Sequence, residues 1–155
     1  MNKYKLTEET KKVNGRVLHR IQALCSFSEV KAGNLGGWIE REENLSQDGT
    51  AWVYDEACVF GSARVYGEAR VYASSCVSGS ARVFDSARVY GESRVFGKAC
   101  VFEKARVFGK ARVFGKACVS GLARVFDSAR VYGKACVFGK ACVSGLEQVC
   151  NDLCC

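Results

Sequence analysis

The chain has 155 residues, enough for a domain with its own core, and a formal net charge of +7. No run of about 18 apolar residues is present, which argues against a membrane-spanning helix. Residues 1–12 hold no apolar stretch typical of a secretion signal. We therefore expect a cytoplasmic protein, in a host cell cytosol, whose ten cysteines are free thiols.

Residues 1–29 are expected to form an N-terminal β-hairpin cap. The pair Asn14-Gly15 is typical of a two-residue type I′ turn, in which both residues take positive φ. The apolar residues that flank this turn are Tyr4, Leu6, Val13, Val17, Leu18, Ile21 and Leu24. Such a cap would cover the open edge of whatever sheet follows it.

Residues 30–50 are glycine-rich and then acidic, and we expect them to form a transition and a first coil. Ile39 and Leu45 are six residues apart, whereas Leu45 and Val53 are eight apart. The longer step predicts a two-residue bulge near Gln47, Asp48 and Gly49.

Residues 51–149 form a repeat with a period of six. Valine recurs without a slip from Val53 to Val149, which makes seventeen consecutive hexads. Alanine usually stands two residues before each valine and glycine two residues after it. A fixed short period indicates a solenoid. Strand alternation points alanine and valine inward, and the residue between them and the following aromatic outward. Residues 150–155 break the pattern and form the C-terminal edge.

The register, as in Val-Phe-Gly-Lys-Ala-Arg, resembles the bacterial hexapeptide repeat. The resemblance implies an all-β fold: a single-chain left-handed parallel β-helix with three hexads per coil and about six coils. The opening KLTEETKKVNGRVLHRIQAL and the segment LGGWIEREENLSQDG make the whole chain similar to uncharacterised hexapeptide-repeat proteins of phages and prophages.

Eighteen residues per coil sort the outward side chains into three faces, with rungs about 4.8 Å apart. The first face carries Cys58, Cys76, Arg94, Arg112, Arg130 and Gln148. The second face carries Arg64, Arg82, Cys100, Cys118, Cys136 and, at its end, Cys154. The third face carries Trp52, Arg70, Arg88, Arg106, Arg124 and Cys142.

The third face is the candidate binding surface, because guanidinium groups bind phosphate and aromatic rings stack on bases. Its candidate residues are Arg70, Arg88, Arg106 and Arg124 with the rings of Tyr72, Tyr90, Phe108 and Phe126. A purely structural alternative, in which each arginine covers a neighbouring ring by cation–π stacking, remains open. Residues 97–143 hold ten Lys and Arg against two acidic residues, which favours an anionic partner.

A secondary basic ladder at a corner holds Lys98, Lys116 and Lys134, beside the cysteines of the second face. Lysine near a thiol can lower the pKa of the thiol and make it reactive. Arg and Cys alternate in one slot throughout the repeat, however, so neutral drift after repeat expansion also explains these cysteines. The terminal cysteines match no common zinc spacing, so no metal site is expected.

The hexapeptide resemblance would imply, for an acyltransferase, a catalytic histidine at a coil edge and a loop excursion. The single histidine, His19, lies in the expected hairpin, and no loop interrupts the repeat. These features predict a non-enzymatic protein that has no cofactor and no catalytic residues.

The functional hypothesis from the sequence is a phage-type accessory protein that binds a host macromolecule, such as a defence complex that targets nucleic acid. The expected partner is a host protein or a protein–nucleic acid complex, with direct contact to nucleic acid or a nucleotide. No membrane contact is expected. The chain is also expected to form a homo-oligomer, as a dimer or trimer. Alternatives are a virion or filament component, favoured by copies of FGKACVSGL 24 residues apart, and a sponge for small anionic nucleotides.

Overall fold

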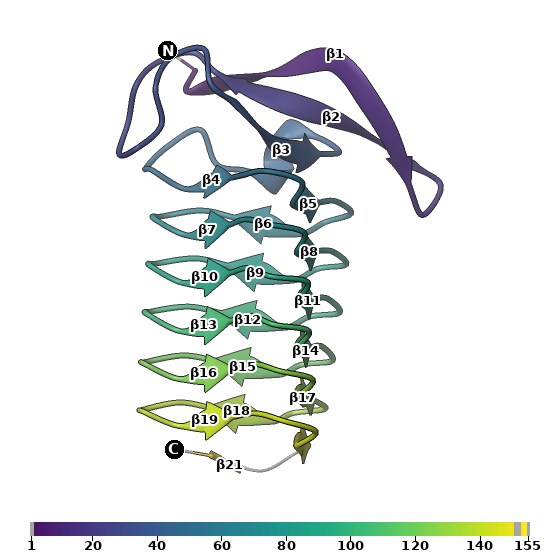
Figure 1. The fold of residues 1–155 in the computed structure, drawn as a ribbon, viewed down its shortest axis with the longest axis vertical. Helices are drawn as coiled ribbons and strands as arrows, with labels where there is room; N and C mark the ends of the chain where they lie inside the picture. Colours follow the sequence, from purple (N-terminus) through teal and green to yellow (C-terminus); the bar gives the residue numbers. More distant parts are fainter. Residues whose placement is uncertain (1, 151–152, 155) are drawn as a thin grey trace.

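The structure, a computed structural model, describes residues 2–150 and 153–154. It is an all-β parallel solenoid beneath an antiparallel hairpin, as Figure 1 shows, so the predicted fold class is confirmed. The repeat forms three columns of short parallel strands, one for each predicted face.

Every strand of the repeat is built around the valine of one hexad. The first face contains β5 (Cys58–Val59), β8 (Cys76–Val77), β11 (Arg94–Val95), β14 (Arg112–Val113), β17 (Arg130–Tyr132) and β20 (Gln148–Cys150). The second face contains β6 (Arg64–Val65), β9 (Arg82–Val83), β12 (Cys100–Val101), β15 (Cys118–Val119), β18 (Cys136–Val137) and β21 (Leu153–Cys154). The third face contains β4 (Trp52–Val53), β7 (Arg70–Val71), β10 (Arg88–Val89), β13 (Arg106–Val107), β16 (Arg124–Val125) and β19 (Cys142–Val143).

The register agrees with the predicted ladders, because each residue pairs with the residue 18 positions on, as Arg88 pairs with Arg106. The end of the second face differs by one position: Cys136 pairs with Leu153, and Cys154 pairs with Val137. The departure follows from the sequence, because the six-residue spacing is lost after Val149.

The cap consists of β1 (Tyr4–Val13), β2 (Arg16–Ala23), β3 (Leu35–Ile39) and the 3-10 helix η1 (Glu42–Asn44). β1 and β2 pair antiparallel, and both Asn14 and Gly15 have positive φ, so the predicted hairpin and its turn are confirmed. β3 then pairs antiparallel with β2 and parallel with β5, which joins the hairpin to the solenoid.

A two-residue insertion separates the first coil from the repeat. Ile39 pairs with Val59 and Leu45 with Val65, which are offsets of 20 residues, whereas Trp52 pairs with Arg70, an offset of 18. The predicted bulge near Gln47 and Asp48 is therefore confirmed, and it lets the non-repeating first coil continue the same three faces.

The core is a narrow column of alanine and valine. From Val53 to Val143 every valine of the repeat is at most 1% exposed, and the alanines two residues before them are fully buried except Ala141, which is 6% exposed. Serine replaces alanine at Ser75 and Ser93, where each hydroxyl donates a hydrogen bond to a backbone carbonyl. The aromatic side chains stand outside this column and stack on one another, as predicted.

The cap buries outward side chains of the first coil. Trp52 is 1% exposed, because the rings of Phe27 and Tyr4 pack edge-on against it at 5.3 and 6.1 Å between centroids. Lys3 is buried beside them, and its Nζ donates to the carbonyl of Ala51 at 2.7 Å. Burial lowers the pKa of Lys3 to about 8.

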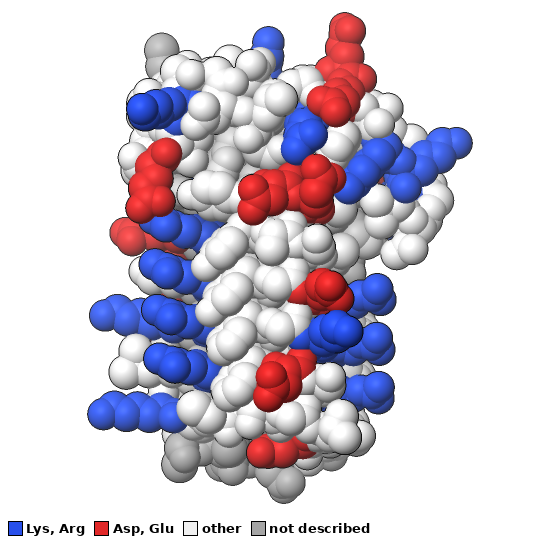
Figure 2. Space-filling view, in the orientation of Figure 1, with Lys and Arg blue, Asp and Glu red and all other residues white. Residues whose placement is uncertain are grey.

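Basic side chains form rows along the solenoid. Figure 2 shows Lys and Arg in two such rows with a strip free of basic side chains between them, and acidic side chains both near the cap and at intervals along the solenoid. Within the described residues, no helix has the length and apolarity needed to cross a membrane.

Candidate functional site

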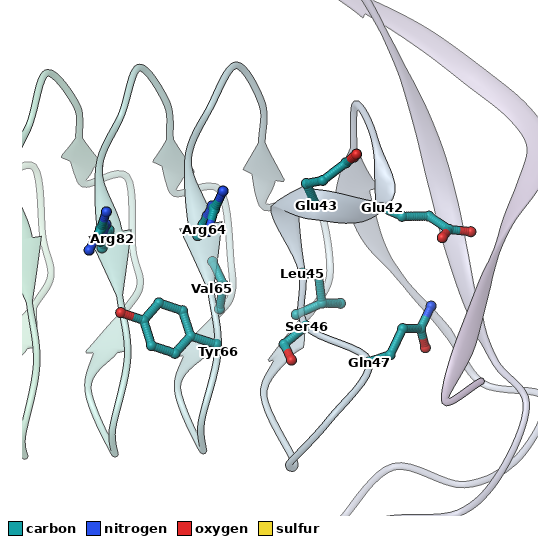
Figure 3. A pocket seen from close by; sticks show the side chains of 9 residues that line it. All are labelled: Glu42, Glu43, Leu45, Ser46, Gln47, Arg64, Val65, Tyr66 and Arg82. Carbon is teal, nitrogen blue, oxygen red and sulfur yellow. The ribbon is translucent and has the colours of Figure 1, made fainter. Parts of the chain in front are cut away.

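A hollow of the surface lies where the cap meets the second face. This junction groove has a volume of about 570 Å³ and is drawn in Figure 3. Its lining residues are Glu42, Glu43, Leu45, Ser46, Gln47, Arg64, Val65, Tyr66 and Arg82.

The solenoid wall of the junction groove is basic and aromatic. Arg64 and Arg82 are register partners on β6 and β9, and both are exposed. Among residues 2–150 neither arginine forms a salt bridge with a carboxylate. Beside them the Tyr66 ring stacks on Phe84, with 4.9 Å between centroids and an interplanar angle of 1°. This wall therefore presents two free guanidinium groups one rung apart and a flat ring.

The cap wall of the junction groove is acidic, because η1 supplies the exposed Glu42 and Glu43. In Figure 3 these glutamates lie across the groove from the two arginines. The Tyr4 hydroxyl supports η1 from behind by donating to the carbonyls of Glu42 at 3.0 Å and Leu45 at 2.6 Å. Burial, with the nearby Glu42 and Glu43 carboxylates, raises the pKa of Tyr4 above its ordinary value.

Asn44 fixes the cap wall to the solenoid. Its side chain is fully buried and makes four hydrogen bonds. The Oδ1 atom accepts from the backbone N–H groups of Glu40 and Arg41 at 3.1 and 2.9 Å. The Nδ2 atom donates to the carbonyls of Gly61 and Ala63 at 3.1 and 2.9 Å. A single amide thus joins η1 to the corner that precedes Arg64.

The chemistry of the junction groove follows from its two walls. Paired guanidinium groups suit a phosphate-bearing group, which they bind through two parallel hydrogen bonds. The ring of Tyr66 offers a stacking surface for a flat base. The carboxylates opposite suit a cation such as an ammonium group. The arginine wall of the groove therefore suits an anionic ligand that carries a flat ring, and the glutamate wall suits a cation.

The predicted third-face residues are brought together as one ladder. Arg70, Arg88, Arg106 and Arg124 are in register on β7, β10, β13 and β16. The rings of Tyr72, Tyr90, Phe108 and Phe126 stack beside them at 4.9 to 5.0 Å. The first arginine of the ladder is occupied by the cap: Arg70 pairs with Glu29 at 3.8 Å and donates to Ser28 Oγ at 3.2 Å. That these residues bind a ligand stays a prediction.

The predicted basic ladder of Lys98, Lys116 and Lys134 also stacks, since the backbone N–H groups of Lys98 and Lys116 donate to the carbonyls of Gly115 and Gly133 one rung on. The eight cysteines from Cys25 to Cys150 are free thiols. In the described part of the chain, no group of three metal-ligating side chains comes together.

His19 lies in β2 as an ordinary strand residue. Its Nδ1 is 3.2 Å from the carbonyl oxygen of Thr7 in the neighbouring strand. The sequence-based interpretation did not find the junction groove, because residues 42–47 precede the repeat. Only the eight-residue step from Leu45 to Val53 signals that this segment still lies over the second face.

Comparison with known proteins gives two matches. Residues 63–79 match the family model described as "YdcK Beta solenoid repeat". The chain is also 36% identical over 88 residues to a protein of Escherichia coli (strain K12) named "Uncharacterized acetyltransferase YdcK". That match covers 51% of this chain and 27% of the relative, so the chain spans about a quarter of the relative's length.

These matches correct the functional hypothesis. Acyltransferases were disfavoured from the sequence, yet the relative is named as an acetyltransferase. The hypothesis of a phage-type accessory protein that binds a host macromolecule is wrong, because the matches support neither a phage origin nor an anti-defence role. Its alternatives, a virion or filament component and a nucleotide sponge, have no support there either. A homo-oligomer and direct nucleic acid contact stay predictions. The chain is a hexapeptide-repeat parallel β-solenoid that shares sequence similarity with YdcK.

Proposed function

We propose that the chain takes part in acetyl-group transfer by holding an acetyl donor with a phosphate-bearing carrier, such as acetyl coenzyme A, in the junction groove. The observation that carries the proposal is the pair of unneutralised guanidinium groups of Arg64 and Arg82 beside the stacked ring of Tyr66. The name of the relative supplies the reaction class.

The spacing of the arginines suits a diphosphate better than a nucleic acid strand. Neighbouring rungs lie about 4.8 Å apart, so two guanidinium forks reach two linked phosphate groups at once. Tyr66 then stacks on the flat base of the carrier. The acetyl thioester extends from there toward η1.

The proposal keeps the prediction that the chain itself is not a catalyst. The protein supplies binding and orientation, and the carrier supplies the activated acetyl group. The predicted cytoplasmic location is part of the same proposal, since coenzyme A thioesters and free thiols such as those of this chain both belong to a reducing compartment.

Isothermal titration with coenzyme A tests the proposal. The Arg64→Gln/Arg82→Gln double variant should bind at least about tenfold more weakly, because hydrogen bonds to charged groups contribute about 1.5–3 kcal/mol each. Arg106→Gln/Arg124→Gln, which removes two register-partner arginines from the third face, is the matched control and should bind like the wild type. Pantetheine, which lacks the phosphates, should bind weakly to every variant.

Two results would contradict the proposal: no binding of coenzyme A to the wild type, or equal binding to the double variant. Incubation of the wild type with acetyl coenzyme A and an amine acceptor tests the catalytic part separately. We expect no release of free coenzyme A thiol above the buffer rate, and steady turnover would show that the chain is an enzyme.

A further inference from the structure

Cys76 lies in a basic hollow on the first face, away from the junction groove. This cysteine trough has a volume of about 270 Å³ and crosses three successive rungs. It is lined by Ser74, Cys76, Glu92, Arg94, Lys110 and Arg112. Three cations and one carboxylate therefore surround a single thiol.

The cations of the cysteine trough are available to a ligand. Arg94 is in register with both Cys76 and Arg112, so the two guanidinium groups follow the thiol along one column. Lys110 stands at the adjoining corner and is exposed. Within the described residues none of these three cations forms a salt bridge. A small anion that enters the trough therefore meets net positive charge.

Cys76 has a second thiol as its other neighbour. Cys58 is its register partner one rung nearer the cap, and it is buried against Trp38 and Phe60. The neighbouring Cys58 thiol, aided by Arg94 and Lys11 and opposed by burial, lowers the pKa of Cys76 to about 7. The same contact, together with burial, raises the pKa of Cys58. Burial of Cys58 and the nearby Arg94 guanidinium therefore make Cys76 the more acidic thiol of the pair.

We propose that Cys76 is a nucleophilic modification site that selects small anionic disulfides and forms a mixed disulfide with them. The Cys76 thiolate attacks one sulfur of the disulfide, a new S–S bond forms, and the original S–S bond breaks. The leaving thiolate takes the electron pair and is protonated by solvent. The small disulfide is the oxidant: Cys76 is oxidised, and one half of the reagent is reduced.

The trough gives this reaction its selectivity for charge. Arg94, Lys110 and Arg112 stabilise the leaving thiolate of either kind of reagent, but they raise the local concentration of an anionic disulfide alone. Cys118 shows the opposite surroundings. It lies between Cys100 and Cys136, and burial and these neighbours raise its pKa to about 11.

Stopped-flow kinetics at pH 7 with two reagents test the proposal. The anionic disulfide 5,5′-dithiobis(2-nitrobenzoate) should modify one thiol in a fast phase, and peptide mapping should place the adduct on Cys76. Cys76→Ser should lose that phase. In the Arg94→Gln/Arg112→Gln variant the rate with the anionic reagent should fall at least about tenfold, and the rate with neutral 4,4′-dithiodipyridine much less. Glutamine already occupies this slot at Gln148, so the variant suits the fold.

Arg106→Gln/Arg124→Gln removes an equal charge from the third face and should leave both rates unchanged. Higher salt should slow only the anionic reagent. The proposal is overturned if the fast phase survives in Cys76→Ser, if the adduct maps to another cysteine, or if the arginine substitutions slow the two reagents equally.

Discussion

The Asn44 side chain offers the sharpest test of how the cap is joined to the solenoid. In Asn44→Ala, the carbonyls of Gly61 and Ala63 lose their amide donor and the N–H of Arg41 loses its acceptor. The N–H of Glu40 keeps a second partner, the carbonyl of Val59 at 3.2 Å. Three of the four polar groups bound by this amide therefore lose their hydrogen-bond partner.

The expected loss of unfolding free energy is about 3 kcal/mol, because each hydrogen bond removed at a buried site contributes about 1 kcal/mol. Asn44→Asp should lose more, since a buried carboxylate would face the two carbonyls. Asn34→Ala is the matched control: the exposed Asn34 side chain accepts one bond, from the N–H of Lys31 at 2.9 Å, and its loss should reduce stability by about 1 kcal/mol or less.

Urea denaturation followed by tryptophan fluorescence measures the stability of all three variants. The method suits this region because Trp38 of the cap and Trp52 beneath it are both buried. Equal denaturation midpoints for Asn44→Ala and Asn34→Ala would refute the reasoning, since the amide would then not hold η1 to the first corner. If Asn44→Ala is destabilised as expected, its affinity for coenzyme A should also fall, because η1 forms one wall of the junction groove.

Three further predictions concern the repeat. Gly97 and Gly145 share a φ near +67°, but a Cβ at Gly97 would lie 2.8 Å from the backbone nitrogen of Gly115, whereas at Gly145 it would meet nothing within 4 Å. Gly97→Ala should therefore lower the urea midpoint more than Gly145→Ala, by an extra penalty of about 1–3 kcal/mol for overpacking; equal midpoints would contradict this. Ser75→Ala should change stability by no more than about 1 kcal/mol, since alanine fills most equivalent slots, and a larger loss in thermal unfolding would show that the Ser75 hydroxyl is needed. The pKa of the Cys118 thiol is about 11 in the folded state, against an ordinary value of 9.0. Between pH 9 and pH 11 the folded state therefore binds more protons than the unfolded state, so the free energy of unfolding should fall as the pH rises through this window. Cys118→Ser should flatten that fall in urea titrations at several pH values, and an unchanged slope would assign it to other groups.

The repeat could be predicted in detail because its period is visible in the sequence. Once valine marks the inward slot every six residues, strand alternation and a coil of three hexads place Arg88 above Arg106 without further information. The hairpin was predictable for a similar local reason, since Asn14-Gly15 specifies its own turn.

The junction groove could not be predicted, because it depends on contacts between segments that share no period. The position of Glu42 above Arg64 follows from the buried amide of Asn44 and from the two-residue insertion near Gln47. The role of Cys76 was missed for another reason. The ladder placed it between Cys58 and Arg94, but only the structure shows that Lys110 and Arg112 reach the same hollow.

The offset of 18 residues between stacked strands also governs how the gene can change length. Loss of 18 codons downstream of Val113 would shorten the molecule by one rung and leave every later side chain on its own face. Loss of the codons for residues 114–119 would move Cys136 into the column of Arg94 and Arg112, and would carry Arg124 from the third face onto the second. Because alanine and valine fill the interior on all three faces, both proteins would retain a packed core. Slippage during replication in units of six codons can therefore reshuffle the surface chemistry of this protein while its fold is inherited unchanged.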